Sequence, residues 1–276
     1  GDGGVWSARN PRREEEGRAR PELSLVDVKL RMVMGIVFFV RKLGALEEIN
    51  YDGVYNLELD LINFGENFEK ELNYIKNEHL KEITARTLDN SPECIVDIPA
   101  SSSGRYHPSY SLGQSGLLRH IKASVGIAYC LIETDIFKNY MTDNGNYQVS
   151  EEYLNWLADC VYSALILHDS RKPDNTPEHH TRFEHPLIAS KYFEKEAEKY
   201  YKEINLKGYD LDDLKGYVFI TREAIACHMG QWNKSEQSPI QLPVPETTLE
   251  TFVHMCDYLS SRKFLQFDFE AYGGVM

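Results

Sequence analysis

An adjacent histidine and aspartate, His168 and Asp169, form the dipeptide of this sequence best suited to chemistry. They directly follow the apolar run 165–167, and Lys172 stands three positions after the aspartate. An imidazole nitrogen and a carboxylate oxygen at the end of an apolar helix can reach one metal ion, and the pair suits Mn, Fe, Zn or Ni. A polar pair that only caps the helix would have the same sequence. The dipeptide therefore needs support from the rest of the chain.

Four more candidate ligands lie on separate predicted helices, each beside apolar residues. The predicted helices cover 116–139, 185–199, 221–229 and 246–263, and they carry in turn His120, His185, His228 and Asp257. Residues three or four apart share a helix face, so His120 lies with Ser124 and Ile127. A single histidine on such a face is usually a satisfied core residue. Five segments that each carry nitrogen or oxygen ligands are instead typical of a metal centre.

A long loop over 91–116 directly precedes the helix of His120. Proline, serine and glycine break the helical pattern there, and the loop contains Arg105, Tyr106 and His107. An arginine can hold a phosphate group, and a tyrosine can stack on a base. We expect these three residues to bind substrate, with a purely structural loop as the alternative.

The order H…HD…H…H…D over 101–265 resembles the HD-domain superfamily of metal-dependent phosphohydrolases. Several local contexts add to this resemblance: Gly116, Leu117 and Leu118 before His120, Lys172 after the HD pair, His185 with Pro186, and Asp257 followed by 258–262. Ser170 and Arg171 depart from the family, which more often has small or apolar residues there. The resemblance implies an all-α, HD-domain helical bundle.

The resemblance also implies a role for each residue. His120, His168, Asp169 and Asp257 would hold one metal ion, and Asp169 would bridge to a second ion bound also by His185 and His228. Asp169 and Lys172 would be the catalytic residues, with Lys172 also binding substrate by neutralising charge on the phosphoryl oxygens. The implied cofactors are two divalent transition metals, Mn or Fe first, with Ni, Zn and Mg as alternatives. Two such ions roughly 3.5–4 Å apart can share a bridging hydroxide that attacks a phosphate ester.

Three classes of function are compatible with this ligand set. The full set of six favours a phosphodiesterase or nuclease that acts on a nucleotide, a cyclic dinucleotide or a nucleic-acid 3′ end. A dNTP or nucleotide phosphohydrolase that uses a single metal is the nearest alternative. An HD-type di-iron oxygenase has the same ligand pattern, and a binding domain stabilised by metal would need a lost ligand.

Composition and pattern divide the chain of 276 residues into three parts. Residues 1–22 have the composition of a disordered tail, and 23–100 predict an N-terminal, mainly helical extension that includes one amphipathic helix over 63–86. Residues 101–276 form the predicted HD phosphohydrolase domain, in which the charged stretch 207–215 is expected to be an insertion or a connector. The loop 170–184, with His179 and His180, is either plain surface or a lid.

Charge and cysteine content indicate the cellular location and the kinds of partner to expect. The formal net charge of −13 disfavours non-specific binding to nucleic acid or to an anionic membrane. The apolar run 32–40 is too short to span a bilayer. Five scattered cysteines without CxxC spacing predict reduced core residues of a cytoplasmic protein. We expect a nucleotide or short nucleic-acid substrate and no membrane partner, and the sequence leaves the oligomeric state open.

Overall fold

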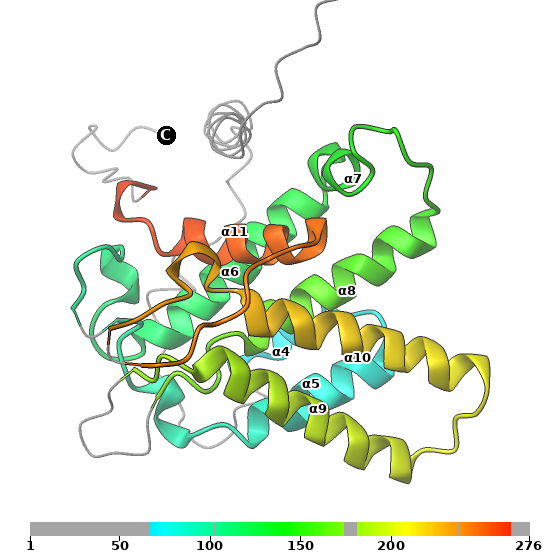
Figure 1. Ribbon diagram of the computed structural model, residues 1–276, viewed down its shortest axis with the longest axis horizontal. Coiled ribbons are helices and arrows are strands. Elements are labelled where there is room, and N and C mark those ends of the chain that lie inside the picture. Colours follow the sequence, from blue (N-terminus) through cyan, green and yellow to red (C-terminus); the bar gives the residue numbers. More distant parts are fainter. Residues whose placement is uncertain (1–66, 102, 174–180, 237, 266–276) are drawn as a thin grey trace, which may run out of the picture. The chain divides into compact units, whose positions relative to one another are not determined.

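The computed structural model describes residues 67–101, 103–173, 181–236 and 238–265 (Figure 1). All of them belong to one compact unit that spans Glu58–Met276. The described part contains eight α-helices and no β-strand, and two isolated bridges join Pro173 to Thr181 and Ser235 to Ser238. The predicted all-α fold is therefore confirmed.

Connections of very different length join the helices. The α-helices are α4 (Glu69–Leu72), α5 (Glu78–Asp89), α6 (Gly116–Ile132), α7 (Asp135–Met141), α8 (Glu151–Leu167), α9 (His185–Glu203), α10 (Tyr209–Cys227) and α11 (Thr248–Ser260). Four short 3₁₀ turns stand between or after them: η2 (Glu93–Val96), η3 (Ser109–Ser111), η4 (Gly230–Trp232) and η5 (Lys263–Leu265).

Helix α8 is the central element of the bundle. It packs against α4, α5, α6, α10 and α11, and α9 packs on the other side of α10 (Figure 1). Every residue from 157 to 170 is buried, as expected for a helix that is apolar on all sides. Ser150 caps its first turn by accepting a hydrogen bond from the Tyr153 amide at 3.1 Å. The HD pair at the other end of α8 therefore lies in the core.

The prediction of one continuous helix over 63–86 is wrong, because α4 and α5 are separate helices in the described part of this range. The chain leaves helical structure between α4 and α5, because the amides of Lys76 and Asn77 donate to the Asp159 carboxylate of α8 at 2.8 and 2.9 Å. Asn77 then caps α5 by accepting from the Leu80 amide. A long-range bond to α8 thus overrides the helical pattern.

Two other predicted segments have different bounds. The helix predicted over 116–139 is two helices, since α6 ends at Ile132 and Thr134 caps α7 by accepting from the Ile136 amide. The connector predicted over 207–215 is wrong, because α10 begins at Tyr209. Its charged residues are mostly exposed, whereas Leu214 is buried in the bundle.

Residues 78–89 of the predicted extension pack as α5 against α8 and α9. The predicted tail 1–22, the apolar run 32–40 and the pair His179 and His180 lie outside the described residues, and the domain boundary at residue 100 stays a prediction. No described helix combines the length and apolar character needed to cross a membrane. The five cysteines are unpaired, three of them buried and two half-buried.

The bond from Asp159 to the α4–α5 turn predicts a stability effect. Asp159 is buried, so Asp159→Ala would leave the two amides of Lys76 and Asn77 without an acceptor and should lower the free energy of unfolding by about 2 kcal/mol. Urea denaturation measures the change. The control Glu152→Ala removes an exposed carboxylate from the same helix and should cost at most about 0.5 kcal/mol. Equal stability of the two variants would contradict the proposed role of Asp159.

Candidate metal centre

Five helices bring the six sequence-predicted ligands to one place. His168 and Asp169 follow the last residue of α8, and His228 follows the last residue of α10. His120 comes from the second turn of α6, His185 opens α9, and Asp257 lies in the last turn of α11. His120, His168, Asp169, His185 and His228 are at most 2% exposed. The Asp257 side chain is 17% exposed, so the centre reaches solvent on its side.

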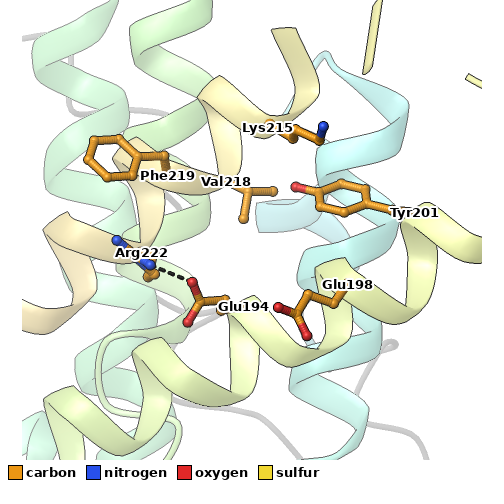
Figure 2. Close-up of a pocket in the computed structure, with 7 residues that line it drawn as sticks. All are labelled: Glu194, Glu198, Tyr201, Lys215, Val218, Phe219 and Arg222. Carbon is orange, nitrogen blue, oxygen red and sulfur yellow. Dashed lines mark hydrogen bonds and ion pairs between the residues drawn. The ribbon is translucent and has the colours of Figure 1, made fainter. Parts of the chain in front are cut away.

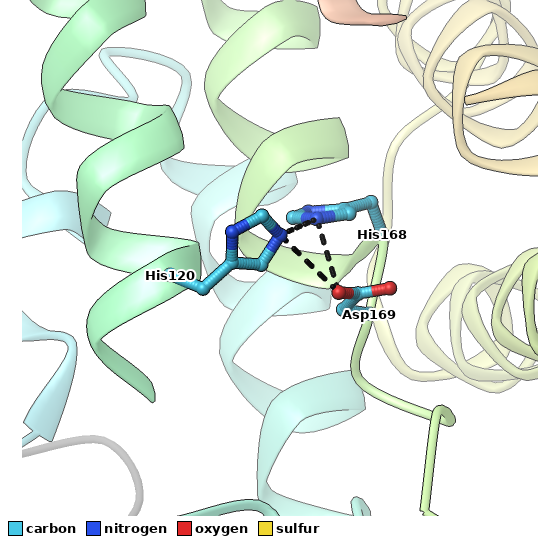
Figure 3. Close-up of side chains that lie close together, drawn as sticks. All are labelled: His120, His168 and Asp169. Carbon is cyan, nitrogen blue, oxygen red and sulfur yellow. Dashed lines mark hydrogen bonds and ion pairs between the residues drawn. The ribbon is translucent and has the colours of Figure 1, made fainter. Parts of the chain in front are cut away.

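Asp169 stands between two pairs of histidines. Its Oδ2 lies 3.4 Å from Nε2 of His120 and 3.5 Å from Nε2 of His168, and these three side chains point toward one another in Figure 3. Its Oδ1 lies 2.9 Å from Nε2 of His185 and 3.6 Å from Nε2 of His228. Each pair of histidines, together with Asp169, is a buried group that can hold a metal ion.

Asp257 belongs with the first of these groups. Its Oδ1 lies 3.0 Å from Nε2 of His120 and 3.5 Å from Nε2 of His168. The first group thus has two nitrogens and two carboxylate oxygens, and the second has two nitrogens and one oxygen. Such mixed sets suit first-row transition metals better than Ca²⁺, which prefers oxygen alone.

Backbone carbonyls set the tautomer of three of the histidines. Each accepts a hydrogen bond from Nδ1 of a histidine three residues later: Leu165 from His168 at 2.7 Å, Arg182 from His185 at 2.6 Å, and Ile225 from His228 at 2.8 Å. A carbonyl oxygen can only accept, so each Nδ1 carries the proton and each Nε2 presents a lone pair. This is the protonation state in which a histidine binds a metal.

Ser260 sets the tautomer of the fourth histidine. Its hydroxyl donates to the Asp257 carbonyl at 2.8 Å and lies 3.1 Å from Nδ1 of His120. Because a hydroxyl has one proton to donate, Ser260 accepts from Nδ1 of His120, and Nε2 of His120 faces the two carboxylates. Burial acts to lower the pKa of His120, but Asp169 and Asp257 outweigh burial and raise that pKa. In all four histidines, Nδ1 makes a hydrogen bond within the protein and Nε2 faces the centre.

The paired nitrogens need a cation between them. Nε2 of His120 lies 3.4 Å from Nε2 of His168, and Nε2 of His185 lies 3.3 Å from Nε2 of His228. Two lone pairs at this distance repel each other unless a proton or a metal ion stands between them. Carboxylate oxygens face the same points, which favours a metal ion, and the side chains present fit one well.

Both carboxylates are ionised despite their surroundings. Burial acts to raise the pKa of Asp169, but Lys172, with its Nζ 2.7 Å from Oδ2, and the facing histidines outweigh it and hold that pKa well below its usual range. Burial also acts to raise the pKa of Asp257, but hydrogen bonds from His120 and His168 outweigh it and hold that pKa well below its usual range. The negative ends of α8 and α10 point into the centre and further favour a cation.

The predicted substrate loop divides into an inner and an outer part. The ring of His107 meets that of His120 edge-on, with centroids 5.7 Å apart, and its Nδ1 is buried without a hydrogen-bond partner. Burial, with the charges of His120 and Lys172, lowers the pKa of His107 to about 4, so the ring is neutral. Arg105 and Tyr106 are exposed, with the guanidinium 6.0 Å from the tyrosine ring. His107 is therefore the loop residue that the fold places against the ligands.

An open groove between α9 and α10 is separate from this centre. Figure 2 shows the side chains that line it: Glu194, Glu198, Tyr201, Lys215, Val218, Phe219 and Arg222. None of the predicted site residues is among them, and Arg222 already pairs with Glu194. The candidate chemistry of this chain thus lies at the buried ends of the helices.

Two residues of the centre carry roles that the sequence did not assign. Ser260 orients His120, and His254 of α11 donates from Nδ1 to the His228 carbonyl at 2.6 Å. Helical spacing from Asp257 puts both on nearby turns of the same helix, which was the one signal available. Their partners lie 140 and 26 residues away, so only the fold identifies the contacts.

No protein-family model matches the chain, and no curated protein or solved structure matches it either. The metal centre therefore rests on the convergence of its side chains. The likeness to HD-domain phosphohydrolases rests on the type and order of the same six residues.

Metal binding should stabilise the protein. A chelator first removes metal from the protein, and Mn²⁺ is then added at about 100 times its dissociation constant. The free energy of unfolding should rise by about 3 kcal/mol, and the unfolding temperature by roughly 5–10 °C. Differential scanning calorimetry measures the shift. Asp169→Ala should abolish the shift, whereas His79→Ala, which removes a half-buried histidine bonded to Tyr200, should retain it. An Mn²⁺ response that persists in Asp169→Ala would place the metal elsewhere.

Proposed function

We propose that this protein is a metal-dependent phosphohydrolase that cleaves phosphodiester bonds with two divalent transition-metal ions. The observation that carries the proposal is the division of Asp169, which turns one oxygen to His120 and His168 and the other to His185 and His228. A carboxylate between two sets of imidazoles that turn Nε2 toward it is suited to bridge two cations. When bound, such a pair activates water as a nucleophile and neutralises the phosphate group.

The order and type of the six ligands support membership of the HD-domain superfamily as part of this proposal. Phosphate ester hydrolysis also fits the surroundings of the centre better than other chemistry does. Lys172 uses one of its three N–H donors on Asp169 and has a side chain 14% exposed, so it can place positive charge beside a phosphoryl oxygen.

His107 would bind and orient the substrate from the solvent side. Its neutral ring has a buried Nδ1 without a partner, beside the first group of ligands. A phosphate ester oxygen is an acceptor that could satisfy it. Arg105 and Tyr106, exposed next to it, would contact the more distant parts of a nucleotide. The net charge of −13 favours a nucleotide, a cyclic dinucleotide or a short 3′ end over a long nucleic acid.

Metal stoichiometry tests the two-ion part of the proposal. We expect two Mn²⁺ per chain in the wild type after equilibrium dialysis, one in His228→Ala, and fewer than one in Asp169→Ala, because only Asp169 faces both groups. Inductively coupled plasma mass spectrometry counts the ions. A single ion in fully loaded wild-type protein would instead favour a nucleotide phosphohydrolase with one metal.

Activity tests the reaction. Mn²⁺-loaded protein should release product from cyclic dinucleotides or short RNA, whereas hydrolysis of nucleoside di- and triphosphates alone would favour a nucleotide phosphohydrolase. Asp169→Ala should lower kcat by 1,000-fold or more, about 4 kcal/mol of barrier. Absence of hydrolysis, together with two irons in protein purified without oxygen and O₂ consumption, would overturn the proposal in favour of a di-iron oxygenase.

Substitutions in the substrate loop separate binding from metal retention. His107→Ala should lower kcat/KM by about 10- to 100-fold, and Arg105→Ala should mainly raise KM, while both keep the wild-type metal content. Tyr147→Ala, which changes an exposed tyrosine in another loop, serves as the control. Wild-type kinetics in both variants would return the loop to a structural role.

A further inference from the structure

A buried histidine outside the six ligands, His254, lies directly behind His228. It is 4% exposed and belongs to α11, three residues before Asp257. Its Nδ1 lies 2.6 Å from the backbone carbonyl oxygen of His228, which can only accept, so His254 is the donor. The contact joins two elements that each carry a candidate ligand.

The His228 carbonyl needs such a donor because of its place in α10. The helix ends at Cys227, and the carbonyls of a last helical turn have no partner within the helix. His228 satisfies one of them with its own side chain, by donating to Ile225. His254 satisfies the carbonyl of His228 itself. Two imidazoles therefore fasten the end of α10, and one of them is the ligand.

The chain after His228 is shaped to fit around the ring of His254. Gly230 has a φ of +57°, and a side chain at this position would overlap the His254 imidazole, so the glycine permits both the turn and the close approach. The rings of Trp232 and Tyr258, which stack on each other, lie near the imidazole with centroids 6.0 and 6.2 Å away. His254 is thus held in one orientation, with its donor aimed at His228.

We propose that His254 is a positioning residue that sets the orientation of His228 for metal binding in the second group of ligands. Helix α11 supplies Asp257 to the first group and, one turn earlier, the donor that fixes a ligand of the second. Loss of this bond leaves the His228 carbonyl unsatisfied in a buried place and frees the end of α10 to move. Metals hold their ligands to narrow distances, so a shift of the backbone at His228 weakens binding. The inference rests on the proposed two-metal centre.

A matched pair of variants tests the hydrogen bond. Leucine and asparagine have nearly the same size and shape, but only asparagine offers an N–H near the position of Nδ1. His254→Leu should bind about one Mn²⁺ per chain at a concentration where the wild type binds two, with the second ion at least 10-fold weaker. His254→Asn should restore two. Equilibrium dialysis with metal analysis gives the stoichiometry, and circular dichroism confirms that both variants are folded.

A second pair tests the same contact if His254→Leu does not fold. Gly230→Ala should push the His254 ring away and weaken the second Mn²⁺. Gly208→Ala, at a comparable φ of +60° but with open space around it, should bind two ions normally. Gly208 precedes the opposite end of α10, about 30 Å from His228 along the helix.

The outcomes distinguish this inference from the function on which it rests. If His254→Leu and Gly230→Ala both bind two ions as tightly as the wild type does, the role of His254 is overturned and the two-metal centre is left intact. Fewer than two ions in the wild type would overturn both. Two ions in the wild type with a selective loss in His254→Leu would support the inference even if no phosphodiester were cleaved.

Discussion

The rest of the structure depends on the interactions of the buried Asp169 carboxylate with its partners. It lies in the core of the bundle, 2% exposed, where an ionised group without partners would be strongly destabilising. Lys172 and four histidines surround its two oxygens, and α8 carries it there because residues 157–170 are buried on every side. A purely structural core would be more stable with an apolar residue at this position. Such a concentration of buried, convergent polar groups is typical of a functional centre.

The histidines at the helix ends around Asp169 have two roles, since they satisfy backbone carbonyls and also face the centre. Carbonyls near the ends of α8 and α10 lack helical partners, and His168 and His228 satisfy them through Nδ1. The same bonds fix the rings so that Nε2 turns into the centre. The cost of ending a helix in the core is offset by hydrogen bonds from the same residues that could hold a metal ion. Ser260 and His254 extend this arrangement to α11 and make the two ligand groups mechanically dependent on one helix.

The centre is closed on most sides and reaches solvent at a few side chains. The histidine ligands are fully buried, whereas Asp257, Lys172 and His107 are each in part exposed. Two of these three offer N–H donors, and the third is a carboxylate that faces the first ligand group.

The sequence by itself determined the local features of this protein. Helical periodicity located α6, α8, α9 and α11, and residue type and order singled out six side chains that the fold brings together. These signals are local, because a helix and its cap depend on neighbours within about four residues. Only the tertiary structure decided how the six are arranged: which oxygen of Asp169 faces which histidines, that His107 rather than Arg105 reaches the ligands, and that His254 stands behind His228. It also decided that Asp159 would end the helical pattern before Asn77. Apart from the contact between the neighbours Asp169 and His168, each of these contacts joins residues at least 13 positions apart, and no pattern along the chain encodes a distance that only packing creates.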